Sequence, residues 1–240
     1  MEDKVGTQEA QHRKWMANFF CGKVKELEFH LKSIVEGCDT SLSDHSALRP
    51  HDERNAKSVI YGFSSLSNCI QSMKDSSSAI LSTDVTWADI KKCRHGEFFY
   101  LSRNAATHDG NPVVSMWADG KFYVPQDIIR FDNRGDLVVI PAPEDDVRVF
   151  CLEFCLDFAV QFKARMTNSD VDADVINGAF DINELKGFME SDKIPQFAKD
   201  LFDQNMGSIE ASLKEAKFNP AHQAVSALDS LIEYCNAKLA

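Results

Sequence analysis

Hydrophobic positions in the first part of the chain recur every three or four residues, which is the spacing of helices with one apolar face. One such stripe covers residues 15–35, and Gly37 predicts the end of that helix, with a polar loop over 38–50. A second stripe covers residues 52–73. The two stripes predict a pair of amphipathic helices that bury their apolar faces.

A third helical pattern begins after Thr86, a favourable N-cap residue, and extends to His108. Gly96 lies inside this pattern and predicts a kink or a break, because glycine lowers helix stability by about 1 kcal/mol relative to alanine. Gly110 and Pro112 predict where the helix stops, since glycine is common just beyond a helix end and proline cannot continue the helix.

Short strands are predicted beyond residue 112, where two pairs of apolar segments are each separated by a turn sequence. The pairs are 113–117 with 121–124 around Asp119-Gly120, and 128–132 with 136–140 around Asn133-Arg134-Gly135. Residues 113–141 are therefore expected to form a small antiparallel β insertion of two to four strands.

The pattern becomes helical again after the acids at 144–146, which favour a helix N-terminus through the helix dipole. This helix, over 147–166, is apolar on most sides and is expected at the centre of a bundle. Residues 167–181 are polar and acidic and predict a linker or an exposed loop. Three further helices follow, and their apolar patterns leave open whether they pack on the bundle or form an appended domain. They are expected at 183–189, 195–216 and 220–239.

The fold class predicted by this order is mainly α, a helical bundle with a small β-hairpin insertion and extra C-terminal helices. The domain boundaries are set at 1–167 for the bundle, which includes the insertion at 113–141, and 168–240 for the C-terminal helical extension. No segment approaches the length of apolar sequence that a membrane span requires, and residues 1–4 do not resemble the start of a secretory signal. A cytoplasmic protein without membrane contact is expected.

Charge limits the kinds of nucleic-acid contact that this chain can make. It carries 37 acidic and 26 basic residues, for a formal net charge of −11. A protein that coats duplex nucleic acid needs a dense basic surface to displace counterions from phosphates. Any contact with nucleic acid is therefore expected to be local, through a few basic side chains that grip one or two phosphates.

The seven cysteines are scattered and odd in number, which is not the pattern of a disulfide framework. Cys151 and Cys155 are four residues apart in a helical pattern, but no further Cys or His at zinc spacing completes a site. The cysteines are expected to be reduced and mostly buried. No metal and no cofactor are predicted.

The sequence that offers the most specific chemistry is Leu101-Ser102-Arg103-Asn104-Ala105-Ala106-Thr107-His108, at the end of the third helical pattern. An Arg, a following Asn and a His after four intervening residues resemble the signature of the HEPN superfamily, the nucleotide-binding domains of higher eukaryotes and prokaryotes. The resemblance covers about eight residues and the helical layout over 15–166. It implies a helical bundle, and a homodimer in which two copies of the motif line one cleft.

The chemistry implied by this resemblance is metal-independent RNA cleavage of toxin or defence type. His108 is the implied general base that takes a proton from a ribose 2′-hydroxyl, since imidazole is poised for proton transfer near neutral pH. Arg103 is the implied stabiliser of charge on the phosphate oxygens, and Asn104 is expected to orient His108 or the phosphate. The products are a 2′,3′-cyclic phosphate and a 5′-hydroxyl.

Helix geometry adds a condition to this site. At 100° per residue, Asn104 and His108 lie on one face of a helix, whereas Arg103 is about 140° away from His108. Either the helix frays before His108, or two copies combine so that each supplies part of the site. A structural reading is also open, in which Arg103 caps carbonyls and His108 is favoured by the helix dipole.

The resemblance also has consequences for partners. The substrate class is RNA, and an inhibitory antitoxin or other regulatory partner is expected because such a nuclease endangers its host. One branch of the family has a modified Tyr two residues after the His, but Gly110 occupies that position here, which argues against that type of antitoxin pairing. The alternative function is a non-catalytic HEPN-like module that binds a nucleotide or RNA, or that dimerises.

Other basic residues are given weaker roles. His95, with Arg94, is most simply explained as a surface residue. Lys121, Arg130 and Arg134 on the hairpins could guide a phosphate, but the sequence favours solvated turns as the explanation for them.

Overall fold

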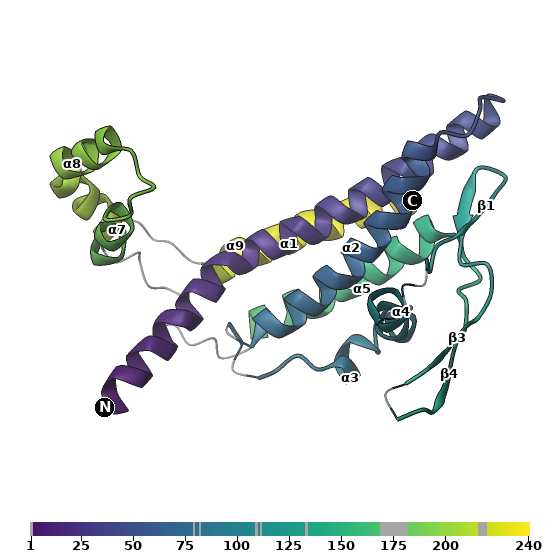
Figure 1. Ribbon diagram of the computed structural model, residues 1–240, viewed down its shortest axis with the longest axis horizontal. Helices are drawn as coiled ribbons and strands as arrows, with labels where there is room; N and C mark the ends of the chain where they lie inside the picture. The colour runs from purple at the N-terminus through teal and green to yellow at the C-terminus, as the bar shows by residue number, and fades with distance from the viewer. Residues whose placement is uncertain are drawn as a thin grey trace.

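The computed structural model describes residues 2–78, 80–81, 83–108, 110, 112–132, 134–168, 182–215 and 220–240. Side chains within these ranges are described except at 2–11, 13, 14, 107, 108, 168, 184, 214 and 215. The described chain is mainly helical and carries two small antiparallel sheets (Figure 1). The predicted fold class, a helical bundle with a β insertion and additional C-terminal helices, is confirmed.

The longest element is α1, Glu2–Ser46, which extends beyond both ends of the predicted helix. Gly37 does not end it, and the predicted loop over 38–50 is wrong for residues 38–46, because the helix continues to Ser46 and leaves only 47–50 as a loop. The reason is packing. A Cβ on Gly37 would lie 2.9 Å from Val59 Cγ2 and 3.2 Å from the main-chain oxygen of Asn55, so this glycine lets a second helix approach closely.

That second helix is α2, Glu53–Ser77, which agrees with the predicted stripe and adds one turn. It begins at Asp52, whose side chain accepts a hydrogen bond from Arg54 N and caps the helix. It lies alongside α1 (Figure 1) and makes a second close approach at Gly62, where a Cβ would be 2.9 Å from Ile34 Cγ1.

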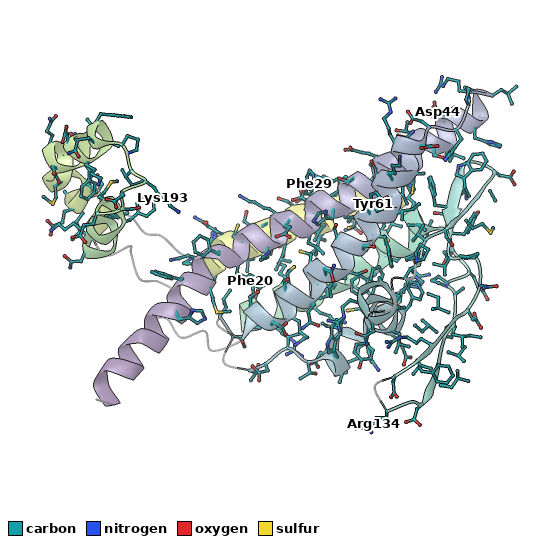
Figure 2. All side chains as sticks on the ribbon, viewed as in Figure 1. Phe20, Phe29, Asp44, Tyr61, Arg134 and Lys193 are labelled. Carbon is teal, nitrogen blue, oxygen red and sulfur yellow. The ribbon has the colours of Figure 1, made fainter. Side chains whose placement is uncertain are left out.

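Two further helices, α5 (Val147–Asn168) and α9 (Pro220–Leu239), complete the bundle. Helix α5 is buried on most sides, as predicted, and packs along α9 and α1. The helix predicted over 220–239 therefore belongs to the bundle core. Aromatic rings dominate that core, and the fully buried ones are Phe20, Phe63, Phe99, Phe150, Phe154, Phe158 and Phe162. In Figure 2, Phe20 lies on the core side of α1, whereas Phe29 on the opposite side is exposed.

The third helical pattern is divided at Gly96 into α3, Trp87–Ile90, and α4, Gly96–His108. The predicted cap at Thr86 is confirmed, because its hydroxyl accepts from Asp89 N and the Asp89 carboxylate accepts from Thr86 N. Helix α4 packs against α2 and α3.

The insertion forms the two predicted hairpins. Strands β1 (Met116–Ala118) and β2 (Lys121–Tyr123) pair antiparallel, as do β3 (Ile128–Phe131) and β4 (Leu137–Ile140). Asp119 and Gly120 have φ values of 50° and 82°, which explains why Asp-Gly suits this turn. The first hairpin is fixed to α1, since Trp117 Nε1 donates a hydrogen bond of 2.9 Å to Ser41 Oγ.

The remaining helices, α7 (Ile182–Met189) and α8 (Gln196–Glu215), pack against each other and lie apart from the bundle in Figure 1. The C-terminal helices thus do not act as one unit, because α9 joins the bundle while α7 and α8 form a separate pair. The linker predicted over 167–181 lies largely outside the described residues, and its first two positions belong to α5. Among the described helices, none is both long and apolar enough to cross a membrane.

Candidate functional site

Helix α4 carries all three residues of the Arg-Asn-His motif. It remains helical up to its last residue, His108, and the chain then reaches Gly110 with a φ of 64°. The predicted helix end is therefore confirmed, whereas fraying of the helix before His108 does not occur. Positions 103 and 108 consequently leave the helix axis about 140° apart, so one copy of the helix does not direct both residues to the same point.

Arg103 is held on the bundle by three contacts from different elements. Its Nη1 donates a hydrogen bond of 2.6 Å to Gln71 Oε1 on α2, and its Nη2 donates to Asn104 Oδ1. The guanidinium also lies 5.5 Å from the ring centroid of Trp87 on α3, a cation–π contact. Asn104 therefore orients Arg103, and the side chain of His108 lies outside the described residues.

The guanidinium of Arg103 keeps some capacity for a ligand. Arginine has five N–H groups, and two of them are used by Gln71 and Asn104. The Nε atom is buried without a hydrogen-bond partner among the described residues. Two N–H groups at the end of the side chain thus have no hydrogen-bond partner among the described residues, and the planar guanidinium suits phosphate oxygens.

A pocket of about 450 Å³ lies between the end of α2 and the start of α3, and it shares Trp87 with the contacts of Arg103. Trp87 and Thr86 line one side, and Lys74, Asp75 and Asp84 supply its charges. Burial raises the pKa of Asp75, but hydrogen bonds from Lys74 and Gln71 and the charge of Arg103 outweigh it, so the pKa lies below its ordinary value. Asp75 is thus a carboxylate at neutral pH, and it partly balances the positive charge of Arg103.

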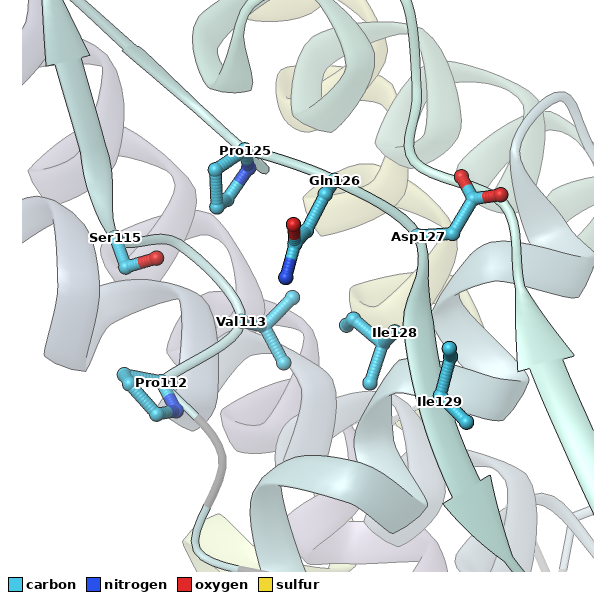
Figure 3. A pocket seen from close by; sticks show the side chains of 8 residues that line it. All are labelled: Pro112, Val113, Ser115, Pro125, Gln126, Asp127, Ile128 and Ile129. Carbon is cyan, nitrogen blue, oxygen red and sulfur yellow. The ribbon is translucent and has the colours of Figure 1, made fainter.

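A second pocket, of about 280 Å³, follows the motif along the chain (Figure 3). Pro112 and Val113, which come soon after α4, form one side, and residues 125–129, which connect the hairpins and begin β3, form the other. Its carboxylate, Asp127, accepts a hydrogen bond of 2.9 Å from Ala142 N and so has a structural role. None of the residues that line this pocket is basic, so it is not suited to bind phosphate.

The β3–β4 hairpin presents an apolar face to solvent next to the motif. One side of the hairpin carries the buried Ile128 and Ile140, and the hairpin packs against α4. The other side carries two cross-strand pairs of exposed apolar residues, which we call the outer hairpin face. Its members are Ile129, Phe131, Leu137 and Val139, and their exposed fractions are 67%, 65%, 58% and 47%.

Among the other basic residues, Lys121 forms an ion pair of 3.1 Å with Asp146. Arg134 is exposed at the tip of the β3–β4 hairpin (Figure 2). Arg130 is half-buried on β3.

The prediction that His95 is a simple surface residue is wrong. Its side chain is 18% exposed, and its Nε2 atom lies 2.8 Å from Glu153 Oε2 on α5. The same carboxylate binds Arg94 through Oε1 at 2.6 Å. Sequence spacing contained no signal for this cluster, since the partners are 58 residues apart.

The cysteines offer no nucleophile to a site. All seven are free and buried. Burial raises the pKa of Cys38, Cys69, Cys93 and Cys235 to about 12, so these thiols are protonated at neutral pH.

Comparisons with known proteins do not extend this description. No family model, no curated protein and no solved structure matches the chain.

Proposed function

We propose that this protein belongs to the HEPN superfamily and is a metal-independent endoribonuclease of toxin or defence type. The observation that carries the proposal is the position of Arg103, Asn104 and His108 at the end of one intact helix, with the guanidinium fixed by Gln71, Asn104 and Trp87. A guanidinium fixed before substrate arrives needs little rearrangement to stabilise charge on a phosphate.

In the proposed reaction, His108 takes the proton from a ribose 2′-hydroxyl as general base. The 2′ oxygen then forms a bond to the adjacent phosphorus, and the bond from phosphorus to the 5′ oxygen of the next nucleotide breaks. Arg103 donates hydrogen bonds to the phosphate oxygens that gain negative charge, while Asn104 holds the guanidinium in place. The leaving 5′ oxygen takes a proton from water, which yields a 2′,3′-cyclic phosphate and a 5′-hydroxyl.

This reaction requires two copies of the chain. Positions 103 and 108 lie about 140° apart around an intact helix, so His108 of one protomer is proposed to act with the partner's Arg103. A twofold arrangement of this kind generates two equivalent sites per homodimer.

The outer hairpin face supports such a dimer. Its four apolar side chains are each about half exposed or more and lie next to one another, and contiguous exposed apolar surface is a feature of interaction sites. The hairpin packs against α4, so a second copy seated on this face lies beside the motif helix. A standard interface buries about 800 Å² on each partner, so neighbouring surface, including the pocket of Figure 3 that shares Ile129, must contribute as well.

Two further proposals follow from a nuclease of this kind. We propose cellular or invading RNA as the substrate and the cytoplasm as the location, and seven free cysteines fit a reducing compartment. Because uncontrolled RNA cleavage damages the host, we also propose an inhibitory antitoxin or regulatory partner.

A second candidate function is favoured by the contacts of Arg103 themselves. The hydrogen bonds to Gln71 and Asn104 and the cation–π contact with Trp87 would equally be made by an arginine whose role is only structural. In that case the protein is a non-catalytic HEPN-like module that binds RNA or a nucleotide, or that dimerises.

The experiment that separates these functions is incubation of the purified chain with a mixed RNA pool in excess chelator. The nuclease is expected to produce fragments with 5′-hydroxyl and 2′,3′-cyclic phosphate ends, and to leave DNA of the same sequence intact, because DNA lacks the 2′-hydroxyl. His108→Ala is expected to lower the rate about 10²- to 10⁴-fold. His12→Ala is the matched control, since His12 is an exposed histidine on α1, far along the chain from the motif.

Cleavage that depends on added metal, or that His108→Ala leaves unchanged, contradicts the proposed mechanism. RNA binding without any cleavage by the wild-type protein supports the binding module instead.

A further inference from the structure

A tight turn between α3 and α4 presents His95 to the side of α5. Cys93 N donates to the carbonyl of Ile90 at 3.0 Å, and Gly96 N donates to the carbonyl of Cys93 at 2.8 Å. His95 has a φ of 60°, which is unusual for a residue with a side chain. A Cβ on Gly96 would lie 2.0 Å from the Ile90 carbonyl oxygen, so only glycine fits at that position.

This turn is attached to α5 by polar contacts. Arg94 N donates a hydrogen bond of 2.9 Å to Asp157 Oδ2. The two oxygens of Glu153 are divided between two partners, with Oε1 bound to Arg94 Nη1 at 2.6 Å and Oε2 lying 2.8 Å from His95 Nε2. The centroid of the His95 ring also lies 6.0 Å from that of Phe150, a buried ring of the core.

Asp145 completes the cluster from the segment that leads into α5. One potential ligand atom from each of His95, Asp145 and Glu153 lies within 4.8 Å of the other two. Among the described residues, these three form the one group of this kind. Asp145 is exposed and forms no ion pair with a described residue. Its carboxylate is therefore free to move toward the other two.

We propose that His95, Asp145 and Glu153 bind a divalent transition-metal ion. Two donors that bind one Zn²⁺ at about 2.0–2.2 Å lie at most about 4.4 Å apart, so the cluster reaches binding geometry with a small movement of Asp145. One imidazole nitrogen and two carboxylate oxygens, without a thiolate, form a mixed set suited to Zn²⁺ and Mn²⁺. Three protein ligands leave at least one position for water.

The remaining contacts of the cluster suit this role. Arg94 binds Oε1 of Glu153 and leaves Oε2 to the ion, as a hydrogen-bond partner that orients a ligating carboxylate does. The two carboxylates and the one guanidinium leave one uncompensated negative charge before the ion binds, which favours a cation.

The site is separate from the motif in the proposed nuclease. His95 precedes α4, whereas Arg103 lies seven residues inside that helix, about 10 Å along its axis. The inference therefore does not rest on the proposed function, and RNA cleavage in chelator says nothing about it.

The test is titration of the tag-free, full-length chain with ZnCl₂ by isothermal calorimetry, and with MnCl₂ by electron paramagnetic resonance. One ion per chain is expected in both, and Asp145→Asn and Glu153→Gln are each expected to weaken binding at least tenfold. Manganese is included because the free cysteines of the chain could also bind zinc, whereas thiols bind manganese poorly. Glu144→Gln is the matched control, since this exposed neighbour is outside the cluster.

His95→Asn is the preferred histidine variant, because asparagine tolerates positive φ and keeps the turn. It is expected to abolish manganese binding while its thermal unfolding without metal stays close to that of the wild type. An absence of binding in the wild type, or equal binding by wild type, Asp145→Asn and Glu153→Gln, overturns the inference and leaves His95 and Glu153 as a structural ion pair.

Discussion

Replacing Arg103 by alanine separates the structural role of this residue from its role in the proposed reaction. The substitution removes the hydrogen bonds to Gln71 and Asn104 and the contact with Trp87. Hydrogen bonds to charged groups contribute about 1.5–3 kcal/mol, and an exposed cation–π contact about 0.5–1 kcal/mol. Because Gln71 and Asn104 are only partly buried and can bind water instead, we expect a net loss of about 2 kcal/mol in the free energy of unfolding.

The assay is urea unfolding followed by circular dichroism, together with a thermal melt. A loss of about 2 kcal/mol corresponds to a decrease of about 4–8 °C in Tm for a chain of this size, so Arg103→Ala stays folded at 25 °C. A double-mutant cycle with Gln71→Ala measures the contact itself, and a coupling energy of about 1 kcal/mol is expected.

Unchanged stability in Arg103→Ala, or additive effects in the cycle, would refute the claim that Arg103 joins α4 to α2. Loss of RNA cleavage in a variant that is still folded at the assay temperature would then belong to the chemistry and not to unfolding.

Three other predictions address the fold, its pH dependence and the outer hairpin face. Gly96→Ala puts a Cβ 2.0 Å from a main-chain oxygen and should destabilise the protein by at least about 2 kcal/mol in urea unfolding, whereas Gly22→Ala, with open space around it, should stabilise α1 by about 0.5–1 kcal/mol. Hydrogen bonds from the N-cap threonine lower the pKa of Asp89 to about 2, so its stabilising effect is complete above the unfolded value of about 3.9 and is lost as pH falls toward 2. The difference in unfolding free energy between wild type and Asp89→Asn should therefore shrink over that interval, and a constant difference would contradict it. Phe131→Ser should shift the proposed dimer to monomer in sedimentation velocity, whereas Phe197→Ser, at a phenylalanine on α8 that is at least as exposed, should not.

Features that depend on local geometry could be predicted from the sequence. The Asp119-Gly120 turn follows from the positive φ that both residues tolerate, and the start of α3 follows from the hydrogen bonds between Thr86 and Asp89. The end of α4 at His108 was likewise indicated by Gly110 and Pro112.

Features that depend on distant partners could not be predicted. Gly37 is a common type of helix terminator in sequence, but here it is the place where α2 approaches α1. Helix α1 continues beyond Gly37 to Ser46. The missing side chain at this position leaves room for Val59, which a Cβ would meet at 2.9 Å.

The candidate site shows the same division. The motif itself was visible in the sequence, but Gln71 and Trp87, which hold Arg103, come from segments 32 and 16 residues away and carry no spacing signal. His95 was missed because its partner is on α5 and its backbone conformation depends on the turn before α4.

Mixing two inactive variants tests the central claim, a site composed from two protomers, most directly. Arg103→Ala and His108→Ala are unfolded together, refolded as a 1:1 mixture, and assayed for RNA cleavage in chelator. If each site combines Arg103 of one protomer with the partner's His108, half of the dimers are mixed and each has one intact site, so about one quarter of wild-type activity is expected. A mixture as inactive as either variant alone, alongside an active wild type refolded in the same way, would contradict a site shared across the twofold axis.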